Sequence, residues 1–410
     1  METGSILFIN IWLKLSAQPK KISHYKQYGP TNWQPITQQQ FQKDIMAIVD
    51  YFTAYGLQIG DQICLVLPNS YEWDVIEKAC FFLGLNLVSI DPGQKNLLVK
   101  NALVLNSKVM IIKDEFPIAA TGTHVPILIN LYQLPILTPV KVDLENIKFN
   151  ADLSFDDLIA YTLFTCDLAG EIKAWCYNQQ QIKDSVDLLA NIFAAHIHQE
   201  RVLVWLPASN PFKIIFNLIA FNLESVLYYQ ENPDSMIKSI RIIKPTILIA
   251  MPFFFEKLKA KLQERLESLM PYKLLPHKLV RYKLMSDGLS EFLDTHLTLY
   301  LLGGQVKFCI SAAAAIQAET LLYLQKHNLK ILEAYTLSES ILPIAINTPE
   351  NIKLGSLGKP IELKSLKFST RGEIFLSSKF LAKTHSNDQD YWLKTNDFGS
   401  LDNDGYLFLH

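Results

Sequence analysis

The sequence of 410 residues has no excess of either charge, because 38 Lys and Arg stand against 40 Asp and Glu and the net charge is -2. Binding to DNA or RNA depends largely on neutralised phosphates, so this balance argues against nucleic acid as a partner. Cysteine is also scarce, odd in number and without Cys-x-x-Cys spacing: Cys64, Cys80, Cys166, Cys176 and Cys309. We therefore expect reduced thiols and a cytoplasmic protein.

Long apolar runs are missing too. No stretch has about 18 uncharged apolar residues in a row, so the sequence predicts no helix that spans a bilayer. Contact with a membrane surface stays open. The apolar run from Ile6 to Leu15 follows Glu2 and contains Asn10 and Lys14, so we interpret it as a docking helix and not as a signal peptide.

Short apolar runs alternate with segments of helical period along most of the chain. The runs of strand length include 63–67, 87–90, 109–112 and 202–206. This order predicts an α/β fold with parallel sheets packed against helices. From about Ile352 onward, short β segments with glycines at their turns predict a smaller β-rich unit. We expect subdomains at 1–150, 151–350 and 351–410, with residues 116–150 joining the first two.

Two segments of the chain are similar to each other. VLPNS at 66–70 and WLPAS at 205–209 are each followed by a helical pattern and a second apolar run. The repetition predicts two βαβ units of similar build. Ser70 and Ser209 are candidate caps for the helices that follow them.

Four segments, in order, resemble the adenylate-forming (AMP-binding) superfamily, and specifically its long-chain acyl-CoA synthetases. They are GLQIGDQI at 56–63 with PNSYEW at 68–73; KPT at 244–246 with MP at 251–252 and FEKL at 255–258; ILEAYTLSE at 331–339; and GEI at 372–374 with WLKTND at 392–397 and DNDGYL at 402–407. Members of this family activate a carboxylate with ATP and usually pass the acyl group to coenzyme A. The resemblance implies a fatty acid or other carboxylate as substrate, and ATP or AMP, Mg²⁺ and coenzyme A as cofactors.

The family's phosphate loop matches FTCDLAGEIKA at 164–174. Thr165, Gly170 and Lys173 keep the family's residue types, whereas a glycine and two hydroxyl residues are replaced by Asp167, Leu168 and Ala169. A carboxylate about 4 Å from a phosphate charge costs about 4 kcal/mol at an effective dielectric constant near 20. The loop therefore predicts weakened ATP binding. Without the family, the same residues read as an ordinary turn.

The resemblance assigns the remaining site residues. It implies that Tyr335 stacks on adenine, that Ser338 contacts the α-phosphate and that Glu339 holds Mg²⁺; Ser338, Glu339 and Lys173 would be catalytic. Asp397 would bind the ribose hydroxyls, and Ala313 would also contact the nucleotide. The substrate would meet Asn210, Ser311, Ala312 and Ala334. Three positions depart from the family: Thr336 and Asn396 replace glycines, and Asn210 stands where a histidine is common.

Family members continue past the matched region with a C-terminal domain of about 100 residues that carries a catalytic lysine, whereas this sequence stops at His410. We expect that domain to be absent. The first hypothesis is an impaired member, a pseudoenzyme that binds an acyl group or adenylate and acts through a partner. The second is an active acyl-activating ligase domain completed by a C-terminal domain in trans. A scaffold without ligand is the third. For the first two, we expect an apolar tunnel beside the turn at 311–315.

Overall fold

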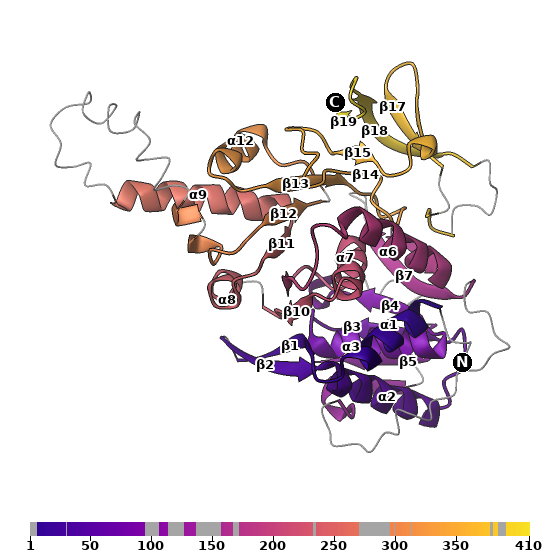
Figure 1. Cartoon of the computed structure of the whole chain (residues 1–410). Coiled ribbons are helices and arrows are strands. Elements are labelled where there is room, and N and C mark those ends of the chain that lie inside the picture. Colours follow the sequence, from indigo (N-terminus) through magenta and orange to yellow (C-terminus); the bar gives the residue numbers. More distant parts are fainter. Residues whose placement is uncertain are drawn as a thin grey trace, which may run out of the picture.

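The computed structural model describes residues 6–29, 31–94, 106–113, 127–136, 157–166, 172–232, 235–269, 296–298, 300–312, 314–377, 380–383 and 391–410. The helices of this part include α1 (Ile6–Ala17), α2 (Gln38–Ala54), α3 (Tyr71–Leu83), α6 (Gln179–Phe193), α7 (Pro211–Asn222), α8 (Met236–Ile243), α9 (Pro252–Leu269) and α12 (Ala318–Lys326). Figure 1 shows that they are packed between and around β-sheets.

The first sheet has six strands in the order β6-β5-β3-β4-β7-β8. Its strands are β3 (Gln62–Val66), β4 (Asn86–Ile90), β5 (Val109–Ile112), β6 (Ile127–Asn130), β7 (Ile159–Cys166) and β8 (Ile172–Asn178). Neighbours pair in parallel from β6 to β7, and β8 closes the edge as an antiparallel strand. The predicted strand runs at 63–67, 87–90 and 109–112 are thus confirmed.

The second sheet has nine strands in the order β15-β14-β13-β12-β11-β9-β10-β1-β2. Its strands are β1 (Ile22–Tyr28), β2 (Asn32–Thr37), β9 (Arg201–Val204), β10 (Val226–Tyr229), β11 (Ile247–Ala250), β12 (Phe308–Ser311), β13 (Ile331–Tyr335), β14 (Ala345–Ile346) and β15 (Lys359–Pro360). The strands from β13 to β1 pair in parallel, whereas β2, β14 and β15 add antiparallel edges.

A third, antiparallel sheet of four strands follows near the C-terminus. It consists of β16 (Leu366–Phe368), β17 (Glu373–Leu376), β18 (Leu393–Leu401) and β19 (Leu407–Leu409). The predicted fold class, parallel sheets with helices and a small β-rich unit, is confirmed. The sheets do not coincide fully with the expected subdomain ranges. The strands β1 and β2, from the range 1–150, lie in the second sheet, and β7 and β8, from the range 151–350, lie in the first. The boundaries at 150 and 350 stay predictions, and most of the expected join at 116–150 is outside the described residues.

The two predicted βαβ units are present as β3-α3-β4 and β9-α7-β10, each with parallel strands. Ser70 caps α3, because its hydroxyl accepts a hydrogen bond from the backbone N–H of Trp73 at 3.2 Å. In the second unit the cap is Asn210, whose Oδ1 accepts from the N–H of Lys213 at 3.1 Å. Ser209 is therefore not the cap of α7. Both side chains satisfy a backbone donor that the first turn of a helix leaves free.

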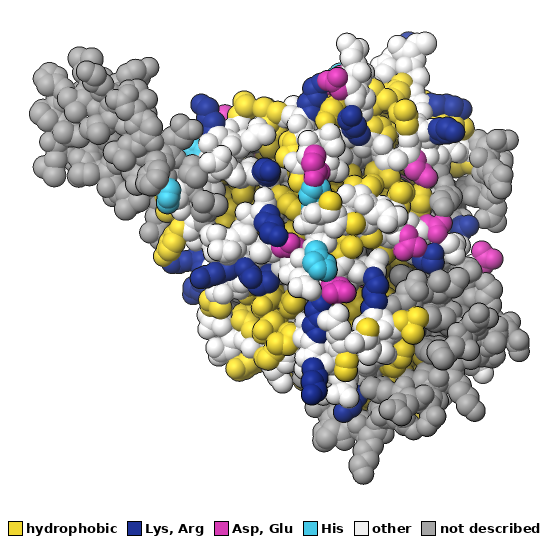
Figure 2. All heavy atoms as spheres, viewed as in Figure 1, with side chains coloured by type: hydrophobic (Ala, Val, Ile, Leu, Met, Phe, Trp, Pro, Cys, Tyr) yellow, Lys and Arg dark blue, Asp and Glu magenta, His cyan; other side chains and the backbone are white. Residues whose placement is uncertain are grey.

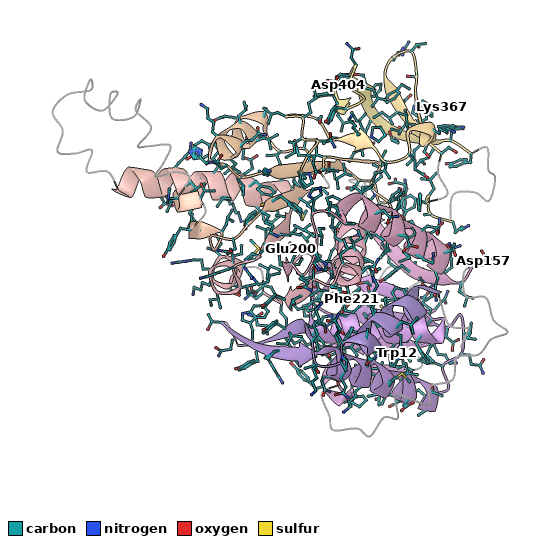
Figure 3. All side chains as sticks on the ribbon, in the orientation of Figure 1. Trp12, Asp157, Glu200, Phe221, Lys367 and Asp404 are labelled. Atoms are coloured by element: carbon teal, nitrogen blue, oxygen red, sulfur yellow. The ribbon has the colours of Figure 1, made fainter. Side chains whose placement is uncertain are left out.

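Helices α1, α2, α3, α6 and α7 form a layer between the first and second sheets, whereas α8, α9 and α12 lie on the outer side of the second sheet (Figure 1). Figure 3 shows the side chains that fill this layer, from Trp12 on α1 to Phe221 on α7. Trp12 and Leu15 are buried, so the predicted docking helix is confirmed. None of the described helices is long and apolar enough to cross a membrane.

A cluster of buried charges lies within this helix layer, centred on α3. Lys78 Nζ binds Asp74 Oδ1 at 2.7 Å and also pairs with Glu77, and all three residues are 1% exposed. His24 Nε2 lies 3.1 Å from Asp74 Oδ2. Burial opposes ionisation of Asp74, but Lys78 and His24 outweigh it and hold the pKa of this carboxyl far below its usual range. These pairs join α3 to β1 of the second sheet.

Three more elements, β7, α2 and α7, contribute to the same cluster. Tyr161 of β7 donates a hydrogen bond to Glu77, and Tyr71 donates to Asp44 of α2 at 2.6 Å. Lys213 of α7 lies with its Nζ 3.5 Å from the centre of the Trp73 ring, and burial lowers its pKa to about 8. The cluster therefore connects helices of this layer with a strand of each sheet, β7 of the first and β1 of the second.

Candidate functional site

A cavity of about 130 Å³ lies where α7 begins and where the chain leaves β13. Both features are at the carboxyl edge of the second sheet, the edge at which open α/β sheets usually bind ligands. The cavity is lined by Asn210, Pro211, Phe212, Thr336, Leu337, Ser338, Ser340, Ile341 and Pro343. The fold thus brings together two predicted site residues, Asn210 and Ser338, that are far apart in the sequence.

The start of α7 gives this cavity a partial positive charge. Asn210 is the N-cap, Pro211 has no N–H, and the N–H of Lys213 is bound by Asn210, so the Phe212 N–H is the donor that the first turn offers at the cavity wall. Such N–H groups and the helix dipole favour anions, including carboxylates. Asn210 was predicted to contact the substrate. Its Oδ1 is used by the cap, which fixes the start of α7, and its direct contact with the substrate stays a prediction.

The turn after β13 carries Ser338 and Glu339. It is held from two sides, because Tyr177 of β8 donates to the carbonyl of Ser338 and the N–H of Ala382 donates to the carbonyl of Glu339 at 2.8 Å. Burial, and then the charge of Glu339, raise the pKa of Tyr177. The Glu339 carboxylate therefore lies near that tyrosine, on the turn whose flanking residues Ser338 and Ser340 line the cavity. The sequence motif identified Ser338 and Glu339, but not Tyr177.

The described residues offer few ligands for Mg²⁺. The described residues contain no group of three His, Cys, Asp or Glu side chains placed to hold a metal ion. Mg²⁺ is commonly bound by one or two carboxylates together with substrate phosphates and water. Glu339 beside Ser338 fits that mode, in which the nucleotide supplies most of the ligands. The assignment of Mg²⁺ to Glu339 stays a prediction.

The two residues predicted to bind the nucleoside contact each other. Tyr335 ends β13 and is 5% exposed, and its hydroxyl donates to Asp397 Oδ2 at 2.5 Å. Asp397 follows Asn396, which has a φ of 65° inside β18, where the register with β17 also shifts. Asparagine tolerates this left-handed conformation better than most residues, so it serves at a position where the family has glycine. Stacking of Tyr335 on adenine stays a prediction.

The phosphate-loop residues are only partly described. Thr165 and Lys173 are cross-strand partners of the β7–β8 hairpin, and Trp175 Nε1 donates to the Thr165 hydroxyl at 2.8 Å. Lys173 is exposed and lies four residues, or about 13 Å of strand, from Tyr177. Gly170, Asp167, Leu168 and Ala169 lie outside the described residues. The described contacts therefore bring Tyr177 to the Ser338 turn, and leave the role of Lys173 a prediction.

The other predicted substrate residues that the structure describes are buried in, or directly after, strands of the second sheet. Ser311, Ala312 and Ala334 are 1%, 4% and 3% exposed and are not among the residues that line the cavity. Ala313 lies outside the described residues. Ser311 is the parallel-strand partner of Glu333, which accepts a hydrogen bond from the N–H of Ile316 at 3.3 Å. Burial raises the pKa of Glu333 to about 7. A glutamate inside the apolar strand ILEAY was a signal that sequence reasoning left unused.

Aromatic side chains pack where an acyl tunnel was expected. Trp205 follows β9 and is 5% exposed, and its ring centre lies 6.0 Å from Phe254 and 6.2 Å from Phe253. Its Nε1 donates to the carbonyl of Ile249 at 2.7 Å, which fixes the ring against β11. The described residues therefore give no support to a long apolar tunnel at this position.

The fold and the site together define an adenylate-forming domain of the acyl-CoA ligase type. The chain belongs to the AMP-binding enzyme family, whose model matches residues 14–383. It is similar to the long-chain-fatty-acid–CoA ligase FadD15 of Mycobacterium bovis, with 22% identity over 92% of this chain and 69% of the ligase. It is also similar to the long-chain-fatty-acid–CoA ligase ACSBG1 of Rattus norvegicus, with 25% identity over 92% of this chain and 60% of that protein.

Solved structures share the fold at lower identity. VinN in complex with L-aspartate has a TM-score of 0.75 and 18% identity, over all of this chain and 99% of VinN. The N-terminal domain of FACL13 from Mycobacterium tuberculosis has a TM-score of 0.72 and 17% identity, over 98% of this chain and 99% of that domain. The o-succinylbenzoate CoA synthetase of Bacillus subtilis, in complex with an acyl-adenylate, has a TM-score of 0.71 and 18% identity, over 98% of this chain and 77% of that one. These likenesses establish the fold.

Proposed function

We propose that this chain binds a carboxylate and an adenylate in the cavity at the start of α7, and that its activation of the carboxylate by ATP is impaired. The observation that carries the proposal is the position of the cavity, between the anion-attracting start of α7 and the turn with Ser338 and Glu339. Tyr335 and Asp397 are linked on the nucleoside side. By contrast, the loop that should hold the β- and γ-phosphates carries Asp167.

Each group has a part in this binding. The Phe212 N–H and the dipole of α7 attract the carboxylate or the acyl-phosphate oxygens. The Ser338 hydroxyl donates a hydrogen bond to the α-phosphate, and the Glu339 carboxylate attracts Mg²⁺. Asp397 accepts hydrogen bonds from ribose hydroxyls. Bound Mg²⁺ would supply charge neutralisation at the phosphates, while these residues orient the adenylate and keep its carbonyl at the helix start.

The size of the cavity supports a small ligand group. Its volume of about 130 Å³ is below the roughly 300–1,000 Å³ of most small-molecule pockets. It is close to the ~150 Å³ of an engineered protein cavity that takes up benzene. With Trp205 packed against Phe254, the described part of the site suits a small acid or the head group of a longer one.

Calorimetric titration tests the proposal with AMP and with ATP in the presence of Mg²⁺. We expect AMP to bind more tightly than ATP, because Asp167 repels the outer phosphates. The triple variant Asp167→Gly, Leu168→Thr, Ala169→Thr should raise ATP affinity by more than tenfold and leave AMP affinity unchanged. Equal ATP affinity before and after this repair would show that Asp167 does not face the phosphates.

The second candidate function is an active acyl-activating ligase whose catalysis also uses residues outside the matched region. The extra length of the curated relatives favours it, because this chain spans 69% of one and 60% of another. Carboxylate-dependent exchange of pyrophosphate into ATP separates the two candidates. Turnover near 1 s⁻¹, alone or with an added family C-terminal domain, supports the ligase; exchange that stays absent under both conditions supports the impaired protein.

A further inference from the structure

We propose that Tyr335 is a positioning residue for Asp397, and that its hydroxyl sets the preference of the site for a nucleotide with an intact ribose diol. This inference rests on the proposed adenylate site. The inference gives the Tyr335 hydroxyl a role separate from that of its ring, which is predicted to stack on adenine. The hydrogen bond between β13 and β18 would then determine which sugar the site prefers.

The first support is the hydrogen bond itself. The Tyr335 hydroxyl donates to Asp397 Oδ2 at 2.5 Å, and this bond joins the second sheet to the C-terminal antiparallel sheet. The bond uses one carboxylate oxygen and leaves Oδ1 as an acceptor for a ligand. A carboxylate with one oxygen held is restricted in rotation, so a vicinal diol meets an acceptor that is already oriented.

The second support is the backbone around Asp397. Asn396 has a left-handed φ of 65°, and the register of β18 with β17 shifts between Glu373 and Phe375. Bulges of this kind change the direction of a side chain next to a site. Thr395 reinforces the arrangement, because its hydroxyl donates to the carbonyl of Ile374 at 2.9 Å and accepts from the N–H of Asp397 at 3.2 Å.

The third support is the burial of Tyr335 and Asp397 and the protonation of the Tyr335 hydroxyl. Tyr335 is 5% exposed, whereas Asp397 is half-buried and can be reached by a ligand. Burial, and then the bond to Asp397, raise the pKa of Tyr335, so the hydroxyl keeps its proton at any working pH. Tyr335 is thus a permanent donor, and Asp397 remains the group that touches the sugar.

The test compares AMP with 2′,3′-dideoxy-AMP by calorimetric titration, in the full chain and in the Tyr335→Phe variant. Phenylalanine keeps the ring in the core and removes only the hydroxyl. We expect the variant to bind AMP about tenfold more weakly, the size of one hydrogen bond to a charged group, and to bind the dideoxy nucleotide as before. In an Asp397→Asn background, Tyr335→Phe should change neither affinity.

The readout is the ratio of the two affinities, which a general loosening of the site would leave unchanged. Tyr406→Phe, a matched loss of a hydroxyl in the C-terminal unit, should keep the wild-type ratio. An unchanged ratio in Tyr335→Phe, or tighter AMP binding because the carboxylate is released, would overturn this inference alone. If the wild-type chain binds neither nucleotide, the proposed adenylate site fails, and this inference fails with it.

Discussion

The pKa values of buried carboxylates are shifted in opposite directions in two regions of this molecule. In the helix layer between the sheets, Asp74 is buried beside Lys78 and His24, and its pKa is held far below the usual range. On β13 of the second sheet, Glu333 is also buried, and its carboxylate accepts a hydrogen bond from the backbone N–H of Ile316 at 3.3 Å. Burial raises the pKa of Glu333 to about 7.

The difference indicates what each region is built to do. A buried charge with nearby partners is a fixed structural element, because removing one partner leaves the other uncompensated. A buried acid without a cation close by has a pKa in the working range and can respond to its surroundings.

Charged side chains on the surface are arranged in a third way. Figure 2 shows that basic and acidic side chains are both spread over the visible face, in agreement with a net charge of -2.

The largest expected effect is in the helix layer. Lys78→Met should lower the free energy of unfolding by about 3–5 kcal/mol, because Asp74 and Glu77 then stay buried without their cation. Denaturant unfolding at pH 7 measures this change. Lys183→Met is the matched control, since Lys183 pairs with Asp187 at the same spacing but near the surface, and its loss should cost about 0.3–0.5 kcal/mol. Equal losses in the two variants would contradict the structural role of the cluster.

A smaller, pH-dependent effect is expected at Glu333. Its pKa is near 7 in the folded chain and near 4.5 when unfolded, so the unfolded chain releases this proton first and stability falls as the pH rises from about 4.5 to 7. Glu333→Gln should therefore be about 1–3 kcal/mol more stable than wild type at pH 8 and lose this advantage toward pH 4.5. Unfolding curves at several pH values measure it, with exposed Glu319→Gln as control. A gain that does not vary with pH would exclude titration of Glu333 as its cause.

The smallest expected effect on stability is at the caps of α3 and α7, and the two caps should differ in their effect on binding. Ser70→Ala and Asn210→Ala each remove a cap and should each cost about 1 kcal/mol of stability. Only Asn210→Ala should also weaken AMP or carboxylate binding, by a few-fold, because only α7 starts at the cavity. Thermal unfolding and calorimetry measure the two properties. Binding that falls equally in both variants would mean that the start of α7 has no special role.

The sequence predicted most of the architecture, because its signals are local. Apolar runs of strand length, the repeated strand–helix–strand pattern and the glycine-rich turns near the C-terminus each depend on residues close together in the chain. The family motifs also singled out Tyr335, Ser338, Glu339 and Asp397, and the structure places Tyr335 at the end of β13, Ser338 and Glu339 on the turn that follows, and Asp397 on β18 in hydrogen-bond contact with Tyr335; their roles stay predictions. Tyr177 and Glu333 were missed, since a tyrosine in one hairpin and a glutamate in an apolar strand carry no motif.

Sequence by itself determined the fold class, the family and the residue types available at the site. Tertiary structure decided which groups are engaged, because hydrogen bonds between distant segments depend on the packing of whole sheets. It gave Asn210, and not Ser209, the cap of α7, and it joined Tyr335 to Asp397 across two sheets. It also packed Trp205 against Phe254, where the motifs alone predicted open space. Motifs report residue type at a position, whereas the free volume and spare hydrogen-bonding capacity around it arise only when the chain is packed.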